Sequence, residues 1–191
     1  MKTIKTTAIF LSMLISCLAV AQGERFALFN GENLEGWNKV GDAEWRIRDG
    51  VLIADDEGGT TYLYTEESYD DFLLTLEFWV DDPANSGVFI RCSDIENIGD
   101  QTCYEVNIFD QRPDPTYRTG GIVGVAPILA NLDTGGRWNT YEIRLEGEHM
   151  EARINGILTA DGSDSRLSSG PIALQYGSGI VKFRNVNIKP L

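Results

Sequence analysis

Apolar and polar residues alternate along most of the chain, and Gly, Asp, Asn or Pro interrupts the alternation every few residues. A period of two is typical of β-strands that bury one face. No segment keeps a helical period for three turns, although residues 128–136 could form a single helical turn. The pattern therefore predicts about eleven short strands and an all-β fold, an antiparallel β-sandwich.

Turn residues separate the predicted strands. Asp-Gly at 49–50 and Asn-Gly at 155–156 predict tight hairpins, because both dipeptides readily adopt positive φ. No internal repeat, linker or low-complexity tract divides the sequence after its first residues. The predicted strands lie within residues 26–31, 43–55, 61–66, 72–81, 87–92, 104–110, 120–126, 140–147, 149–156, 170–177 and 180–191.

Three consecutive predicted strands, at 72–81, 87–92 and 104–110, place polar and aromatic residues opposite their apolar faces. Consecutive strands are commonly antiparallel neighbours, so we predict that these residues share one sheet face. A ring that stacks on a sugar, beside carboxylates and amides that bind hydroxyl groups, would suit a saccharide site. An ordinary solvated outer face is the alternative. The predicted face holds Glu77, Trp79, Phe89, Arg91, Glu105 and Asn107.

The N-terminal residues have the pattern of an export signal. Lys2 and Lys5 precede an apolar run, and Ala19-Val20-Ala21 offers a small-residue cleavage site. We therefore expect a signal peptide at 1–21, one domain at 22–191, and a periplasmic or cell-surface location. Cys17 ends a stretch that resembles a lipobox, so lipidation is an alternative that would tether the protein to a membrane.

The chain is acidic, with a formal net charge of −13, which becomes −15 once Lys2 and Lys5 are removed. Such a charge disfavours nucleic acids and anionic membrane surfaces as partners and leaves neutral sugars or cations. The acidic cluster 55–57 could bind a divalent metal such as Ca²⁺, although a charged turn explains it better. The sequence predicts no cofactor beyond this weak signal and no oligomeric state.

Cys92 and Cys103 flank a ten-residue loop between two predicted strands. An exported protein meets an oxidising environment, so this spacing predicts a disulfide that staples the two strands. Two free thiols remain the alternative.

Nine motifs, in this order, resemble the 3-keto-disaccharide hydrolase domain family, formerly a domain of unknown function. The resemblance implies a concanavalin A-like jelly roll, as in lectins and bacterial β-glucanases, in an exported protein that acts on glycosides oxidised at C3. The motifs lie at 28–37, 45–52, 69–78, 85–91, 104–110, 119–127, 136–147, 152–157 and 170–191.

The implied chemistry needs one base, because a C3 ketone acidifies the C2 proton and the aglycone then leaves from C1. Glu105 is the predicted base or metal-ligating carboxylate, and Arg91 is predicted to hold the substrate or stabilise the enolate. Asp110 is a third catalytic candidate, since a bulge could return it to the Glu105 face, with turn capping as its alternative role.

Two other functions stay open. A retaining glucanase needs two carboxyl groups about 5–5.5 Å apart. The row Glu105-x-Asn107-x-x-Asp110 lacks a middle acid, and its end residues would lie roughly 13–16 Å apart along a strand. A non-catalytic carbohydrate-binding module is the other function.

Further substrate-binding candidates come from a loop and from a later strand. Tyr117 and Arg118 lie in a proline-containing loop that could wall the site. Gln175 faces away from the core, and Tyr176 follows it. Relatives often carry His at the position of Tyr176 and Gln at that of Asn107, and this departure leaves the activity open.

Overall fold

The computed structural model describes residues 23–55 and 58–191. The expected signal peptide with Cys17, and Asp56 and Glu57 of the acidic cluster, lie outside the described residues. Within the part that is described, no helix has the length and apolar composition needed to cross a membrane.

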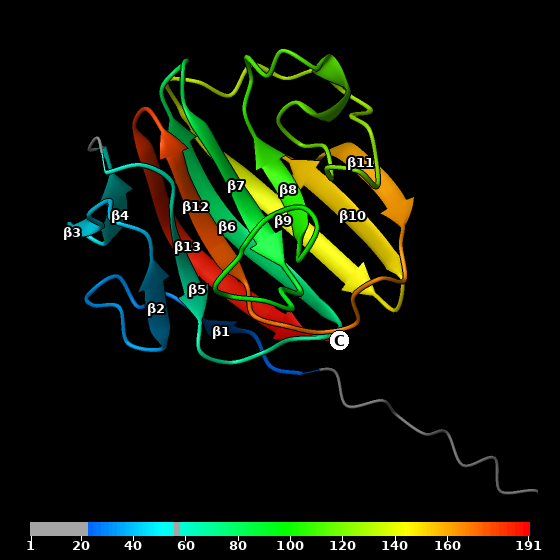
Figure 1. Cartoon of the computed structure of the whole chain (residues 1–191), viewed down its shortest axis with the longest axis horizontal. Coiled ribbons are helices and arrows are strands. Elements are labelled where there is room, and N and C mark those ends of the chain that lie inside the picture. Colours follow the sequence, from blue (N-terminus) through cyan, green and yellow to red (C-terminus); the bar gives the residue numbers. More distant parts are fainter. Residues whose placement is uncertain (1–22, 56–57) are drawn as a thin grey trace, which may run out of the picture.

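Two antiparallel sheets form the domain (Figure 1). The larger sheet has the strand order β11-β10-β9-β6-β13-β4-β3, with β1 also paired to β13, and the smaller sheet has the order β2-β5-β12-β7-β8. The larger sheet comprises β1 (Phe26–Ala27), β3 (Arg46–Arg48), β4 (Val51–Ala54), β6 (Phe72–Val80), β9 (Trp138–Glu146), β10 (His149–Ile154), β11 (Ile157–Ser163) and β13 (Val181–Pro190). The smaller sheet comprises β2 (Trp37–Val40), β5 (Thr61–Thr65), β7 (Asn85–Ile90), β8 (Tyr104–Ile108) and β12 (Ala173–Ser178).

The predicted antiparallel sandwich is thus confirmed. Asp49 and Asn155 adopt positive φ at the two predicted hairpin turns, each followed by a glycine that does the same. The helical turn falls elsewhere than expected: residues 128–136 are irregular, and a 3₁₀ turn forms at Pro115–Tyr117, where Asp114 caps its first residues.

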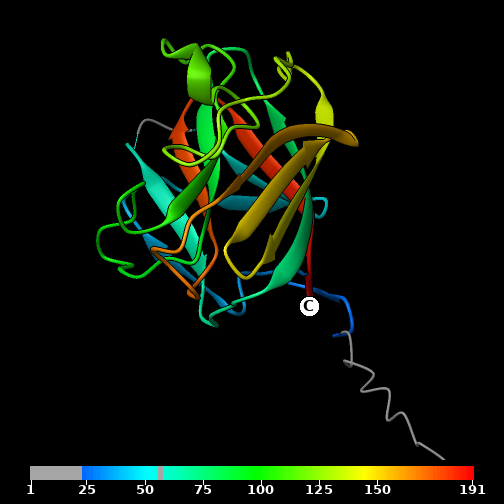
Figure 2. The same cartoon turned by 90° about the vertical axis from the view of Figure 1, so that its right-hand side faces the viewer.

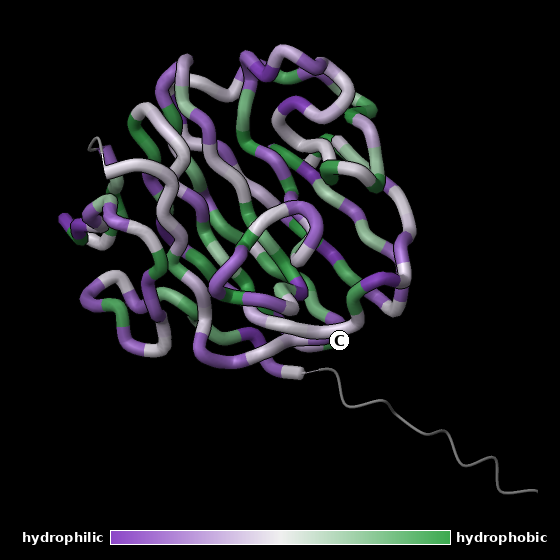
Figure 3. Tube along the Cα trace, in the orientation of Figure 1, coloured by the Kyte–Doolittle hydropathy of each residue, from purple (hydrophilic) through white to green (hydrophobic). Residues whose placement is uncertain are grey.

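The core lies between the inner faces of the two sheets. On β6 every second side chain is buried, from Phe72 to Val80, and β10 shows the same alternation. The tube in Figure 3 shows apolar and polar residues alternating along these strands, and Figure 2 shows the sandwich from its side. Burial of alternate residues from both sheets is what holds such a sandwich together.

The prediction that β6 neighbours β7 and β8 is wrong. The chain turns after Val80, where Ala84 donates a backbone hydrogen bond to Asp81, and β7 then joins the other sheet. Glu77 and Trp79 therefore lie on the outer face of the larger sheet, away from Glu105. A jelly roll commonly passes the chain from one sheet to the other, and a period of two does not indicate which sheet a strand joins.

Glu77 and Trp79 have partners of their own on that face. The Glu77 carboxylate lies 2.6 Å from the Arg184 guanidinium, and Lys182 Nζ lies 4.0 Å from the centre of the Trp79 ring. These contacts are those of a charged sheet surface, and the predicted substrate-binding role of both residues is not supported by their position.

The predicted catalytic role of Arg91 is also contradicted. β7 ends at Ile90, and Arg91 adopts a φ of 52°, which turns its side chain out of the strand alternation. The guanidinium is buried, and its N–H groups donate to the carbonyls of Asp70, Gly147 and Leu167 and to the Asp71 carboxylate. A guanidinium has five N–H donors, and these contacts occupy all of them, so Arg91 ties three loops together.

We predict that Arg91→Met destabilises the domain by about 3 kcal/mol, because loss of the buried cation leaves carbonyl acceptors unpaired. Urea unfolding followed by tryptophan fluorescence measures the effect. Arg144→Met is the matched control, since Arg144 pairs with Glu146 at a solvent-exposed position and its loss should cost about 0.5 kcal/mol or less. Equal unfolding midpoints for the two variants would contradict the assigned structural role.

Candidate functional site

The outer face of the smaller sheet gathers the predicted base with residues from three other strands. The strand register places Tyr62 opposite Gln175, Gln175 opposite Gly87, and Gly87 opposite Asn107. In the next row Phe89 lies opposite Glu105. We call this group the Gly87 face; its members are Tyr62, Gly87, Phe89, Glu105, Asn107 and Gln175.

Gly87 makes room for the carboxylate at the centre of this face. A Cβ atom at this position would lie 3.3 Å from Glu105 Oε1 and 3.3 Å from Phe89 Cε2. These are tighter than ordinary contacts, so the Glu105 carboxylate lies directly over the bare backbone of β7. A larger residue at 87 would displace the carboxylate or the ring.

The environment of Glu105 raises its pKa from 4.5 to about 7. Burial is the main cause, Arg112 acts in the opposite direction, and Asp100 raises the pKa further. Among the described residues none donates a hydrogen bond to this carboxylate or forms an ion pair with it. A carboxyl group that changes protonation state near neutral pH, with no structural partner, is suited to general acid–base chemistry.

Tyr62 and Gln175 supply polar groups beside Glu105. Gln175 Nε2 donates to the Tyr62 hydroxyl over 3.2 Å, while Gln175 Oε1 is buried without a partner among the described residues. Burial raises the pKa of Tyr62, so its hydroxyl stays protonated at neutral pH and can donate. Its ring meets Phe89 edge-on, with 5.2 Å between ring centres.

Phe89 is covered rather than open to a ligand. It is 2% exposed and packs with Cys92, Cys103 and Ala173. Its position supports Glu105 from the side, so its predicted contact with substrate is replaced by a packing role. Tyr62 and Tyr64, both half-buried on this face, are the aromatic residues that retain exposed surface.

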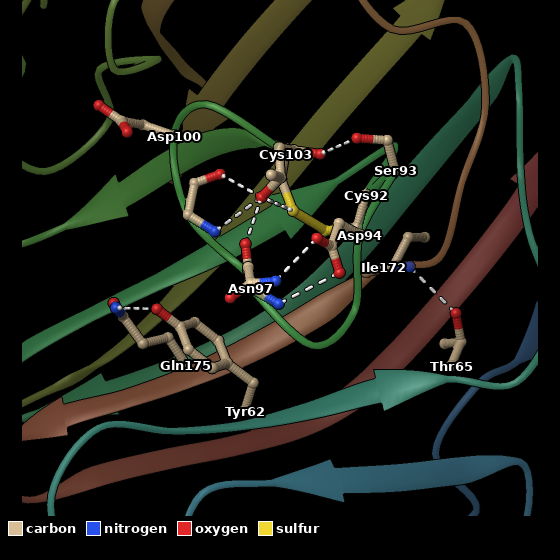
Figure 4. The surroundings of a disulfide bond; sticks show 12 residues. Tyr62, Thr65, Cys92, Ser93, Asp94, Asn97, Asp100, Cys103, Ile172 and Gln175 are labelled. Carbon is tan, nitrogen blue, oxygen red and sulfur yellow. Dashed lines mark hydrogen bonds between the residues drawn. A yellow bond between two sulfur atoms is a disulfide. The ribbon is translucent and has the colours of Figure 1, made fainter.

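The predicted disulfide between Cys92 and Cys103 is present. It closes the loop 93–102, in which hydrogen bonds link Asn97 to Asp94 and Thr102 to Asn97 (Figure 4). Ile98 packs against the Phe89 cluster together with Tyr62 and Tyr64. The loop therefore borders the Gly87 face, and Figure 4 shows Tyr62 and Gln175 next to it.

Asn107 anchors the following loop. Its side-chain amide donates to the Tyr117 carbonyl, and its backbone exchanges hydrogen bonds with Gly120 and Gly121. Segment 119–123 thereby covers the free edge of β8. The Asn107 side chain is fully buried, and its Oδ1 has no hydrogen-bond partner among the described residues. Asn107 and Tyr117 thus fix the loop beside Glu105 instead of offering free groups to a sugar.

Asp110 does not form an acid pair with Glu105. Its carboxylate accepts hydrogen bonds from the hydroxyl groups of Thr119 and Thr134 and from the backbone N–H groups of Thr134 and Gly135. With both oxygens engaged, Asp110 joins two loops, which contradicts its predicted catalytic role. Arg118 lies with Asp110 in a separate cavity that Asp82 and Asp133 also line. This cavity is not part of the Gly87 face.

Tyr176 points away from the Gly87 face. It belongs to the core cluster and is 4% exposed, as strand alternation requires of the residue that follows Gln175. Its predicted contact with substrate is therefore wrong.

Sequence reasoning missed four residues that shape this face: Tyr62, Gly87, Asp100 and Arg112. The alternation of Tyr62 and Tyr64 with Leu63 indicates an outward tyrosine pair, but only the pairing of β5 with β12 places Tyr62 beside Gln175. Asp100 and Arg112 lie in loops, for which the sequence carries no comparable signal.

Three solved structures illustrate the similarity to known proteins. Two are putative glycosyl hydrolases from Parabacteroides distasonis: one has a TM-score of 0.79 at 19% identity, covering 88% of this chain and 94% of that one. The other has a TM-score of 0.75 at 27% identity, covering 88% and 100%. A carbohydrate-binding module from Bacillus subtilis has a TM-score of 0.63 at 17% identity, covering 79% and 93%.

Galectin-like and β-glucanase folds among the structural neighbours confirm the predicted concanavalin A-like jelly roll. No protein of curated function matches the chain in sequence. The model of the 3-keto-alpha-glucoside-1,2-lyase-like domain matches residues 25–189. The chain therefore belongs to this family of carbohydrate-active, glycosyl hydrolase-like domains.

Proposed function

We propose that this protein cleaves 3-keto-glycosides, with Glu105 as the base that removes the C2 proton. The observation that carries the proposal is the Glu105 carboxylate itself: it is largely buried, has a pKa of about 7, and lies over Gly87 without a partner among the described residues. A carboxyl group whose pKa lies near neutral pH is an efficient general base, because it can both accept and return a proton at that pH.

The reaction proceeds in balanced steps. Glu105 takes the proton from C2, and the electron pair of that bond forms an enolate with the neighbouring C3 ketone. The ketone reforms as the bond between C1 and the aglycone oxygen breaks, leaving a double bond between C1 and C2. Protonated Glu105 can return its proton to the departing oxygen. Addition of water to the double bond would complete a net hydrolysis.

Tyr62 and Tyr64 are the proposed substrate-binding residues, and Gln175 is the proposed positioning residue for Tyr62. The protonated Tyr62 hydroxyl can donate to the enolate oxygen or to a sugar hydroxyl, and Gln175 Nε2 holds that hydroxyl in place by donating to it. The exposed parts of both tyrosine rings offer apolar surface to sugar C–H groups. The family match and the glycosyl hydrolase-like neighbours support a saccharide as the substrate.

A retaining glycosidase mechanism fits these residues less well, because it needs a second carboxyl group about 5–5.5 Å from the first. Asp110 is engaged in loop contacts, and Asp100, which raises the pKa of Glu105, sits on an exposed loop. A single-base elimination requires no such pair.

We also propose that the protein acts outside the cytoplasm, in the periplasm or at the cell surface. The disulfide between Cys92 and Cys103 supports this location, because structural disulfides persist in oxidising compartments.

A non-catalytic carbohydrate-binding role is the second candidate. It is favoured by the similarity in fold to a carbohydrate-binding module from Bacillus subtilis. Calorimetry with a 3-keto-glucoside separates the two functions: binding without any release of aglycone supports a binding module and contradicts the lyase.

We predict that Glu105→Gln lowers the turnover of a chromogenic 3-keto-glucoside by about 10²–10⁴-fold, because the amide cannot accept the C2 proton. The substitution keeps the shape of the side chain, so the unfolding midpoint should not fall. Release of the chromophore measures the rate. Glu96→Gln is the control: it also replaces one glutamate by glutamine, but in the neighbouring loop 93–102, and it should retain full activity. Full turnover by Glu105→Gln would remove Glu105 from the catalytic role.

We predict that activity rises with pH through a midpoint near 7, since only ionised Glu105 is a base. Asp100→Asn should move this midpoint to lower pH, because Asp100 raises the pKa of Glu105, and Arg112→Gln should move it to higher pH. Profiles of kcat/KM against pH test both shifts. Identical midpoints in the three proteins would show that another group controls the profile.

A further inference from the structure

We propose that His149, Glu151 and Asp161 form a binding site for a divalent transition-metal ion such as Zn²⁺. The site lies on the outer face of the larger sheet, so it is separate from the Gly87 face and independent of the function proposed above. Its ligands come from β10 and from the edge strand β11.

The strand register brings the three side chains together. Glu151 lies directly opposite Asp161, and His149 shares the face of Glu151 because it is two residues away on the same strand. His149 Nε2 lies 2.8 Å from Asp161 Oδ1. One ligand atom from each residue lies within 4.8 Å of the other two.

These distances suit a tetrahedral ion after small side-chain rotations. Zinc binds imidazole nitrogen and carboxylate oxygen at about 2.0–2.2 Å, which places ligand atoms about 3.3 Å apart. The side chains are 44%, 25% and 46% exposed for His149, Glu151 and Asp161, respectively, so they can rotate and water can take the fourth position. An imidazole with two carboxylates favours Zn²⁺, Co²⁺ or Ni²⁺ over Ca²⁺.

The charges around the site favour a cation. Two carboxylates directly opposite each other on paired strands repel one another. Arg153 Nη2 lies 3.3 Å from Glu151 Oε2 and offsets part of this repulsion. Arg144 lies opposite Glu151 on β9, but its guanidinium pairs with Glu146 at 2.6 Å. A divalent ion would neutralise the negative charge of Glu151 and Asp161 that the two arginines do not neutralise. Glu151 would have to give up its contact with Arg153 to bind the ion.

A metal ion here would link the edge strand β11 to the rest of the larger sheet. Edge strands have unpaired backbone groups and are among the easier parts of a sheet to open. An ion that binds only the folded hairpin stabilises the domain in proportion to its affinity and concentration.

Calorimetric titration of the metal-free, full-length protein with Zn²⁺ tests the proposal, and Co²⁺ absorption reports tetrahedral coordination. We expect one ion per chain and a higher unfolding temperature with Zn²⁺. His149→Gln and Asp161→Asn should each weaken Zn²⁺ binding by about tenfold or more, the least expected when a ligand is lost, and reduce the thermal shift measured at the same Zn²⁺ concentration.

Glu148→Gln is the matched control, since it removes an acidic side chain next to His149 that is not in the cluster, and it should bind Zn²⁺ as the unchanged protein does. Absence of Zn²⁺ binding to the unchanged protein would overturn the proposal. So would equal affinity in His149→Gln, which would place the ion elsewhere.

Discussion

Each strand of the sandwich must turn one side chain in two towards the core that the two sheets share, and the placement of the functional groups depends on this constraint. On β12 the constraint directs Leu174 and Tyr176 inwards and Gln175 outwards. On β8 it buries Val106 and directs Glu105 outwards. The Gly87 face is therefore the outer side of strands whose inner side packs in the core. These strands hold the Glu105 carboxylate on a rigid support.

The two outer faces of the domain treat carboxylates differently. On the Gly87 face, the disulfide-closed loop and the loop after β8 crowd Glu105, which loses water without gaining a hydrogen bond from any described residue, and its pKa rises. On the larger sheet, Glu77 is half-buried but meets Arg184 and Asn185, whose contacts lower its pKa. Desolvation without a partner among the described residues thus distinguishes Glu105 from Glu77.

The sequence predicts the local parts of this structure and not their pairing. Alternation and turn residues correctly indicate most strands, the two Gly-containing hairpins and the outward side of Glu105, and the cysteine spacing correctly indicates the disulfide. The predicted strand at 120–126 forms only isolated bridges at Ile122 and Ala126, and β2 was not predicted. Alternation predicts which face of a strand a residue lies on, but not which sheet the strand joins. The prediction that Glu77 and Trp79 lie beside Glu105 was therefore wrong. Arg91 escaped prediction because its positive φ ends the alternation one residue after β7. Tyr62 meets Gln175 across 113 residues of sequence, a separation at which no local pattern operates.

The disulfide offsets the loss of folding stability that the buried Glu105 carboxylate causes at neutral pH. The raised pKa means that the folded state holds the Glu105 proton more tightly than the unfolded state does. The free-energy cost is absent below pH about 4.5, where Glu105 is protonated in both the folded and the unfolded state. It grows as the pH rises from about 4.5 to about 7, and above pH about 7 it reaches its full value of about 3 kcal/mol. Closing a loop with a sequence separation of 11 residues stabilises the fold by about 3 kcal/mol. The loop that brings Asp100 towards Glu105 is thus the one that the disulfide closes, and the same covalent bond both shapes the site and sustains it at neutral pH.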